Sequence, residues 1–174
     1  MLSTWHQFIA GITSLPLASV LFVVCVLCLA GFGWRGRKFH GVDAPDSIKN
    51  GSTAAIVRES MEKLGDAGRK LYIWTQFTLD LVFPAAYAVF FAVTCQWFMP
   101  HEYVWLSALP LVAAIADYVE NFSAIYLAAT FRKDSPSPLA GLTATATNLK
   151  VVFLIASLGA LGWCGVTWVL RLLS

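Results

Sequence analysis

The chain has 174 residues, of which 58% are hydrophobic and only 13% are charged, and its formal net charge is +2. Soluble domains are about one quarter charged, so this composition argues against an ordinary water-soluble protein and predicts an integral, multi-pass membrane protein whose main partner is the lipid bilayer. The small net charge says little about nucleic acid, and we expect no nucleic-acid partner. The length predicts a single domain, residues 1–174.

The first apolar stretch covers about residues 8–32, and residues 1–34 contain no Asp, Glu, Lys or Arg. It exceeds the roughly 20 residues that are needed to cross a bilayer. A signal peptide would have a basic beginning and a shorter apolar core of about 7–15 residues, so we expect a retained transmembrane helix. Arg35, Arg37 and Lys38 follow it directly and begin a loop.

Cys25 and Cys28 have the spacing of a redox pair, and small membrane oxidoreductases use such pairs. They lie within an uninterrupted apolar stretch that offers no nearby cation to lower the pKa of a thiol. We therefore interpret them as core or lipid-facing residues. The pairing of Cys95 and Cys164 is not indicated by the sequence.

Residues 35–70 form the only long polar segment. Ser52 is the predicted cap of a helix that ends near Leu64. One face of this helix is apolar and carries Ile56 and Met61, whereas the opposite face is charged. The pattern suits a short amphipathic helix on the membrane surface, and it equally suits a helix that packs on the protein's own cytosolic side.

Three further apolar stretches predict transmembrane helices over about residues 71–98, 103–130 and 139–170. Pro84 lies inside the first of these, where it removes the usual donor to the Asp80 carbonyl and kinks the helix. The fold class is therefore all-α. We expect a four-helix membrane bundle with one short amphipathic surface helix in the first cytosolic loop.

The orientation follows from the distribution of Lys and Arg. Loops 35–70 and 131–138 contain basic residues, whereas the N-terminal tail and the link 99–102 contain none. The positive-inside rule places both basic loops in the cytosol and both termini outside.

Polar side chains recur on one face of each of three predicted spans. At a rise of about 1.5 Å per residue, the charged side chains of these spans lie at overlapping depths. Each charge inside a bilayer costs about 2.5–3.5 kcal/mol, so it is retained only where it faces inward and finds a partner. The predicted buried cluster consists of Asp80, Tyr87, Asp117, Glu120, Asn121 and Lys150, with Gln76, Thr143 and Thr147 as a second tier.

Three carboxylates in this cluster face one ammonium group. Either at least one carboxyl group carries a proton at neutral pH or a cation occupies the site. If that cation is a metal ion, Asp80, Asp117 and Glu120 are its candidate ligands. The alternative is a structural role, in which hydrogen bonds between helices, worth under about 2 kcal/mol each, fix the register of the bundle.

Three functions follow as hypotheses. The first is proton- or cation-linked transport, by a homo-oligomer or by a membrane assembly of which this chain is a subunit. The second is a membrane enzyme that acts on a lipid or isoprenoid substrate from the cytosolic leaflet, with Asp117 or Glu120 as acid/base or metal ligand. The third is a non-catalytic scaffold. An open pocket at the cluster favours chemistry, and a sealed cluster favours the scaffold.

Overall fold

The computed structural model describes residues 2–46, 51–98, 101–133, 135 and 137–173, which form helices and no strand. The elements are α1 (Leu2–Ile12), α2 (Leu15–Lys38), α3 (Ala54–Thr78), α4 (Phe83–Phe98), the 3-10 helix η1 (His101–Ala108), α5 (Leu109–Ala129) and α6 (Pro138–Leu173). Four stretches are long and apolar enough to cross a membrane: Leu15–Lys38, Ala54–Phe98, Trp105–Ala129 and Pro138–Leu170. The predicted all-helical architecture with four such stretches is confirmed.

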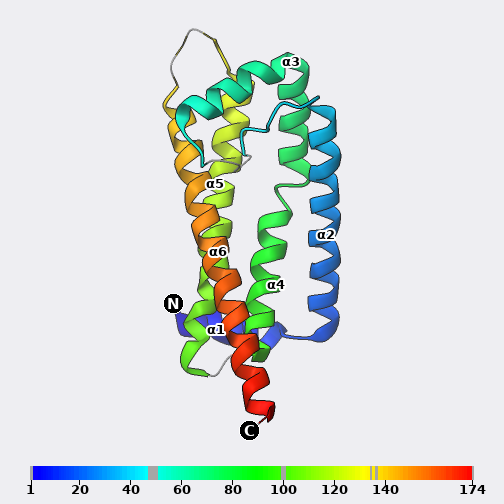
Figure 1. The fold of residues 1–174 in the computed structure, drawn as a ribbon, viewed down its shortest axis with the longest axis vertical. Coiled ribbons are helices and arrows are strands. Elements are labelled where there is room, and N and C mark those ends of the chain that lie inside the picture. Colours follow the sequence, from blue (N-terminus) through cyan, green and yellow to red (C-terminus); the bar gives the residue numbers. More distant parts are fainter. Residues whose placement is uncertain (1, 47–50, 99–100, 134, 136, 174) are drawn as a thin grey trace.

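The first apolar stretch forms two helices, so the predicted span 8–32 is wrong at both ends. α1 lies across one end of the bundle, and α2 starts and ends later than predicted (Figure 1). Ser14 caps α2 by accepting a hydrogen bond from the Leu17 N–H at 3.4 Å, and Pro16 lies in the first turn, where its missing N–H costs nothing. Because α2 extends further, Arg35 belongs to its last turns and not to the loop.

Segment 54–64 is the predicted amphipathic helix, and its apolar face packs on the protein. Val57 and Met61 are fully buried in a cluster with Leu127 of α5. α3 then bends at Gly65, whose φ of 62° is a backbone conformation that glycine adopts without strain. After the bend, α3 runs along the bundle (Figure 1). Of the two alternatives left open by the sequence, the structure has the helix packed against its own bundle.

The residue that caps segment 54–64 is Thr53, one position later than predicted. Its side chain accepts a hydrogen bond from the Ile56 N–H at 3.3 Å. The backbone of Ser52 is held by α6 instead, because the Asn148 side chain donates to its carbonyl at 2.8 Å and accepts from its N–H at 2.9 Å. These two bonds fix the end of the first loop against α6.

The predicted span 71–98 is interrupted between α3 and α4 (Figure 1). Residues 79–82 form turns, and Pro84 is the second residue of α4. Proline has no N–H, so the Asp80 carbonyl loses its usual intrahelical donor, as the sequence predicts. The Asn121 side-chain amide takes that place and donates to the Asp80 carbonyl at 2.9 Å. The expected kink is therefore a complete break.

The helices pack through small side chains. α5 lies along α6 and α4 lies against both α2 and α5. Ala86, Ala113 and Ala114 are buried between α4 and α5, where small side chains let helices approach closely. α2 ends, α5 ends and α6 begins at the same end of the bundle, beneath segment 54–64 (Figure 1). We name this the basic end; its exposed or half-buried cations are Arg37, Lys38, Arg58, Lys63, Arg69, Lys70, Arg132 and Lys133.

Candidate functional site

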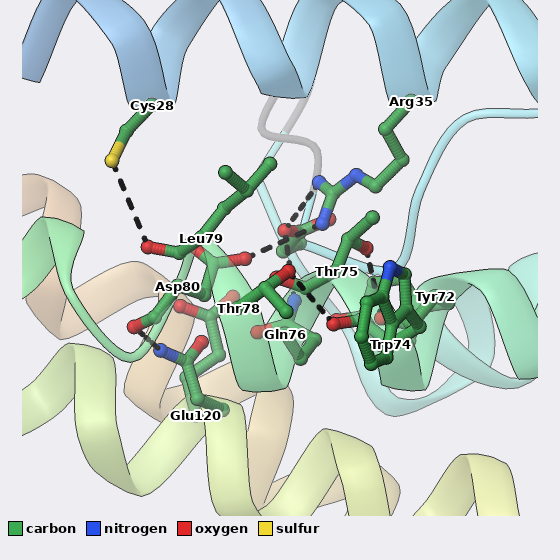
Figure 2. A network of polar contacts seen from close by, with 12 residues as sticks. Cys28, Arg35, Tyr72, Trp74, Thr75, Gln76, Thr78, Leu79, Asp80 and Glu120 are labelled. Atoms are coloured by element: carbon green, nitrogen blue, oxygen red, sulfur yellow. Dashed lines mark hydrogen bonds and ion pairs between the residues drawn. The ribbon is translucent and has the colours of Figure 1, made fainter.

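The break between α3 and α4 is held by side chains from neighbouring helices. The Tyr118 hydroxyl of α5 donates to the Leu81 carbonyl at 2.9 Å. The Cys28 thiol of α2 points at the Leu79 carbonyl, with sulfur and oxygen 3.9 Å apart (Figure 2). Together with Asn121, these contacts replace regular helix hydrogen bonds at the irregular backbone.

We expect Asn121→Ala to lower the free energy of unfolding by about 1–3 kcal/mol, because it leaves the buried Asp80 carbonyl without a donor. Equilibrium unfolding in detergent measures this change. The control is Gln7→Ala at an exposed position of α1, where a surface substitution changes stability by less than about 0.5 kcal/mol. Equal stabilities of the two variants would mean that Asn121 does not support the break.

Arg35 connects the first loop to the helix break. It points from α2 toward Asp80, and its guanidinium nitrogens lie 3.3 Å from an Asp80 carboxylate oxygen and 2.8 Å from an Asp46 carboxylate oxygen (Figure 2). The guanidinium carbon also lies 5.1 Å from the Phe32 ring centroid and 5.3 Å from that of Tyr72. Arg35 is only 6% exposed, so its charge is balanced by these partners and not by water.

Asp46 brings a loop carboxylate to this site. Besides Arg35, the Gln76 side-chain amide donates to it at 3.3 Å. Burial raises the pKa of Asp46, but the positive charges of Arg35 and Lys150 more than offset this and hold the pKa below its usual 3.8. The loop contact therefore contributes stability above about pH 4 and loses it as the pH falls through the lowered value.

Lys150 on α6 forms the second ion-pair group. Its ammonium lies 3.2 Å from Asp117 and also pairs with Glu120, both on α5. The Tyr87 hydroxyl of α4 donates to the other oxygen of Asp117 at 3.2 Å, and the Thr147 hydroxyl donates to Glu120 at 2.7 Å. Asp117 is 2% exposed and Glu120 is 0% exposed, so both carboxylates are buried among three helices.

The residues predicted to form one cluster are divided between two adjoining groups. Asp80 pairs with Arg35 and not with Lys150. The predicted direction of its side chain assumed a continuous helix, but Asp80 lies in the break between α3 and α4. The second-tier residues are placed as follows: Gln76 bonds Asp46, Thr147 bonds Glu120, and Thr143 bonds Ser123 at 2.8 Å.

Sequence reasoning missed Arg35 and Asp46. For Arg35 a signal was present, because Cys28, Gly31 and Arg35 have the spacing of one helix face. Gly31 lies so close to the break that an added β-carbon would be 2.6 Å from the Leu79 side chain. For Asp46 no pattern in the loop indicated a buried partner.

The described residues contain no group of three or more His, Cys, Asp or Glu side chains that is arranged to bind a metal ion. Asp80, Asp117 and Glu120, the metal ligands considered from sequence, are divided between Arg35 and Lys150. All four cysteines are free thiols.

A cavity of about 530 Å³ lies between the two ion-pair groups and is partly open. Loop residues 41–44 form part of its wall, so the cavity lies where the first loop packs on the bundle. Among the described residues that line it and belong to the two ion-pair groups, three carboxylates outnumber two cations: Asp46, Asp80 and Asp117 against Arg35 and Lys150. We name it the acidic cavity.

Comparisons with protein-family models, curated proteins and solved structures gave no match to this chain. We therefore infer function from the helix break, the two ion-pair groups and the acidic cavity.

Proposed function

We propose that this chain is a small integral membrane protein that takes up a proton or another cation in the acidic cavity. The uptake is a step in transport, carried out by an oligomer of this chain or by a membrane assembly that contains it. The observation that carries the proposal is the position of Asp80, which lies in a broken helix and on the wall of a cavity where carboxylates outnumber cations.

A broken helix of this kind supports a binding role. Irregular backbone inside a membrane is tolerated where it is buried in protein or lines a cavity, and broken helices of transporters line their ion and substrate sites. A purely structural polar cluster needs no cavity beside its ion pairs. Here the cavity reaches Asp80, Asp117 and Lys150, members of both ion-pair groups.

The surplus of carboxylates favours a positively charged ligand. Including Glu120, which pairs with Lys150 behind the cavity wall, the two groups hold four carboxylates and two cationic side chains. A proton or cation reduces this imbalance in a poorly solvated place. The positive-inside rule puts the basic end in the cytosol, so the ligand enters from the cytosolic side and both termini lie outside.

We expect Asp80→Asn to reduce proton- or cation-dependent flux into proteoliposomes by about tenfold or more, the effect of losing about 1.4 kcal/mol of binding. A pH-sensitive or cation-sensitive dye inside the vesicles measures the flux. The matched control is Asp66→Asn, since the Asp66 side chain is 89% exposed and lies outside the acidic cavity. Wild-type vesicles that behave like empty ones, or equal flux for both variants, would contradict the proposal.

A second candidate is a membrane enzyme that acts on a lipid or isoprenoid substrate. The observation that favours it is the apolar part of the same cavity wall, where Phe32, Phe39, Phe83 and Leu154 lie beside the charged groups. Asp117 lines the cavity and Glu120 does not, so Asp117 is the better placed acid/base. Mass spectrometry of lipids incubated with the wild type and with Asp117→Asn tests this alternative, which requires a product that the variant fails to make.

A further inference from the structure

A second polar cavity, of about 310 Å³, lies at the basic end between the end of α5 and the start of α6. The polar residues that line it are Arg58, Thr130, Arg132, Ser135 and Ser137, so its lining includes two arginines and three hydroxyl-bearing residues. None of the described residues that line it carries a carboxylate, in contrast to the acidic cavity. We name it the basic cavity.

Among the described residues, Arg58 is held in place by uncharged groups. Its guanidinium donates to the backbone carbonyls of Ser135 at 2.5 Å and Lys133 at 2.9 Å, and it lies 5.9 Å from the centroid of the Phe131 ring. Carbonyl oxygens and an aromatic ring orient the guanidinium plane but leave its full positive charge. The charge is thus fixed at the cavity wall.

Arg132 supplies a second charge that is available to a ligand. The neighbouring cations are engaged, because Lys133 pairs with Glu62 and Arg69 pairs with Asp66. The exposed Arg132 side chain makes no hydrogen bond or ion pair with another described residue. Two guanidinium groups, one fixed and one unpaired, therefore meet at one cavity.

We propose that the basic cavity binds the phosphate group of an anionic ligand. Guanidinium groups offer paired N–H donors that match phosphate oxygens, and the Ser135 and Ser137 hydroxyl groups add further donors, whereas the Thr130 hydroxyl already donates to the Tyr126 carbonyl. The cavity lies where the apolar stretch of α5 ends and that of α6 begins, which is the level of lipid headgroups in a membrane protein. The phosphate belongs to an anionic phospholipid headgroup or to a soluble phosphate compound, and the position favours the lipid. The site is independent of the proposed transport.

The test is the thermal unfolding of the purified full chain in detergent, titrated separately with dioctanoyl phosphatidylglycerol, dioctanoyl phosphatidylcholine and inorganic phosphate. We expect phosphatidylglycerol to raise the midpoint temperature saturably and the zwitterionic phosphatidylcholine to raise it less. Arg132→Gln is expected to increase the half-saturating concentration about tenfold, the effect of one lost charged hydrogen bond. The matched control is Arg37→Gln, which removes the same charge from an exposed position at the same end.

Each outcome decides between the sources or against the site. A response to phosphatidylglycerol that only Arg132→Gln weakens supports a lipid site. An equal response to inorganic phosphate, again weakened only by Arg132→Gln, supports the site with a soluble ligand. The proposal is overturned if no phosphate compound stabilises the protein, or if Arg132→Gln and Arg37→Gln weaken the response equally, because general surface charge then explains it.

Discussion

Replacing Lys150 with methionine is expected to lower the free energy of unfolding by about 3–5 kcal/mol, the usual cost of removing one partner of a buried ion pair. Asp117 and Glu120 would then remain in the bundle with no nearby ammonium, although they are only 2% and 0% exposed. Methionine has a similar length and no charge, so the change tests the charge more than the packing. Reversible unfolding in mixed micelles measures the loss.

Two comparisons make this test specific. Lys63→Met removes an ammonium from an exposed pair with Glu59, where the Lys63 side chain is 60% exposed, and pairs of this kind contribute little to stability because water screens them. A loss for Lys150→Met no larger than that for Lys63→Met would contradict the buried pairing. The variant that also carries Asp117→Asn and Glu120→Gln should recover most of the stability. If this triple variant is more stable than the wild type, the buried charges lower the stability of the protein, as expected of groups that are kept for function.

The second large effect is expected at Arg35. Arg35→Met removes the cation shared by Asp46 and Asp80, and we expect a loss of about 3 kcal/mol, at the lower end for buried pairs, because the loop residue Asp46 is free to move into water. The variant should also release residues 39–46 from the bundle. Hydrogen exchange of the backbone amides in this loop reports the release, since local opening there no longer has to break an ion pair.

Arg35→Lys separates charge from geometry. Lysine keeps the positive charge but lacks the planar fork that reaches two carboxylates from one position, so an intermediate stability and intermediate exchange are expected. Arg37→Met is the control, because Arg37 is exposed two residues further along α2. Unchanged loop exchange in Arg35→Met would mean that the pair of Arg35 with Asp46 does not anchor the loop.

Hydropathy and helical spacing predicted the long apolar helices and the seam between α5 and α6. Asp117, Glu120 and Lys150 lie at helical spacings within regular helices, so their direction follows from a period of 3.6 residues. The same reasoning predicted the effect of Pro84 on the Asp80 carbonyl, because that effect depends only on chain-local chemistry.

Local irregularities explain what the sequence did not predict. The separation of α1 from α2 rests on the Ser14 cap and Pro16 within a run that is apolar throughout, and average hydropathy is insensitive to both. Arg35 stands among other basic residues, so its burial depends on contacts with Asp46 and Asp80 that no local pattern reveals. The side-chain direction of Asp80 was not predictable, because helical spacing no longer applies at the break between α3 and α4.

Two adjacent residues of α5 hold different parts of the site around the acidic cavity. Glu120 binds Lys150, and Asn121 binds the backbone of the break that carries Asp80. An axial slide of α5 by a single residue, about 1.5 Å, would disturb both sets of contacts at once. The two ion-pair groups are therefore coupled through the α5 helix. A displacement of α5 that breaks the contacts of one group also disturbs those of the other.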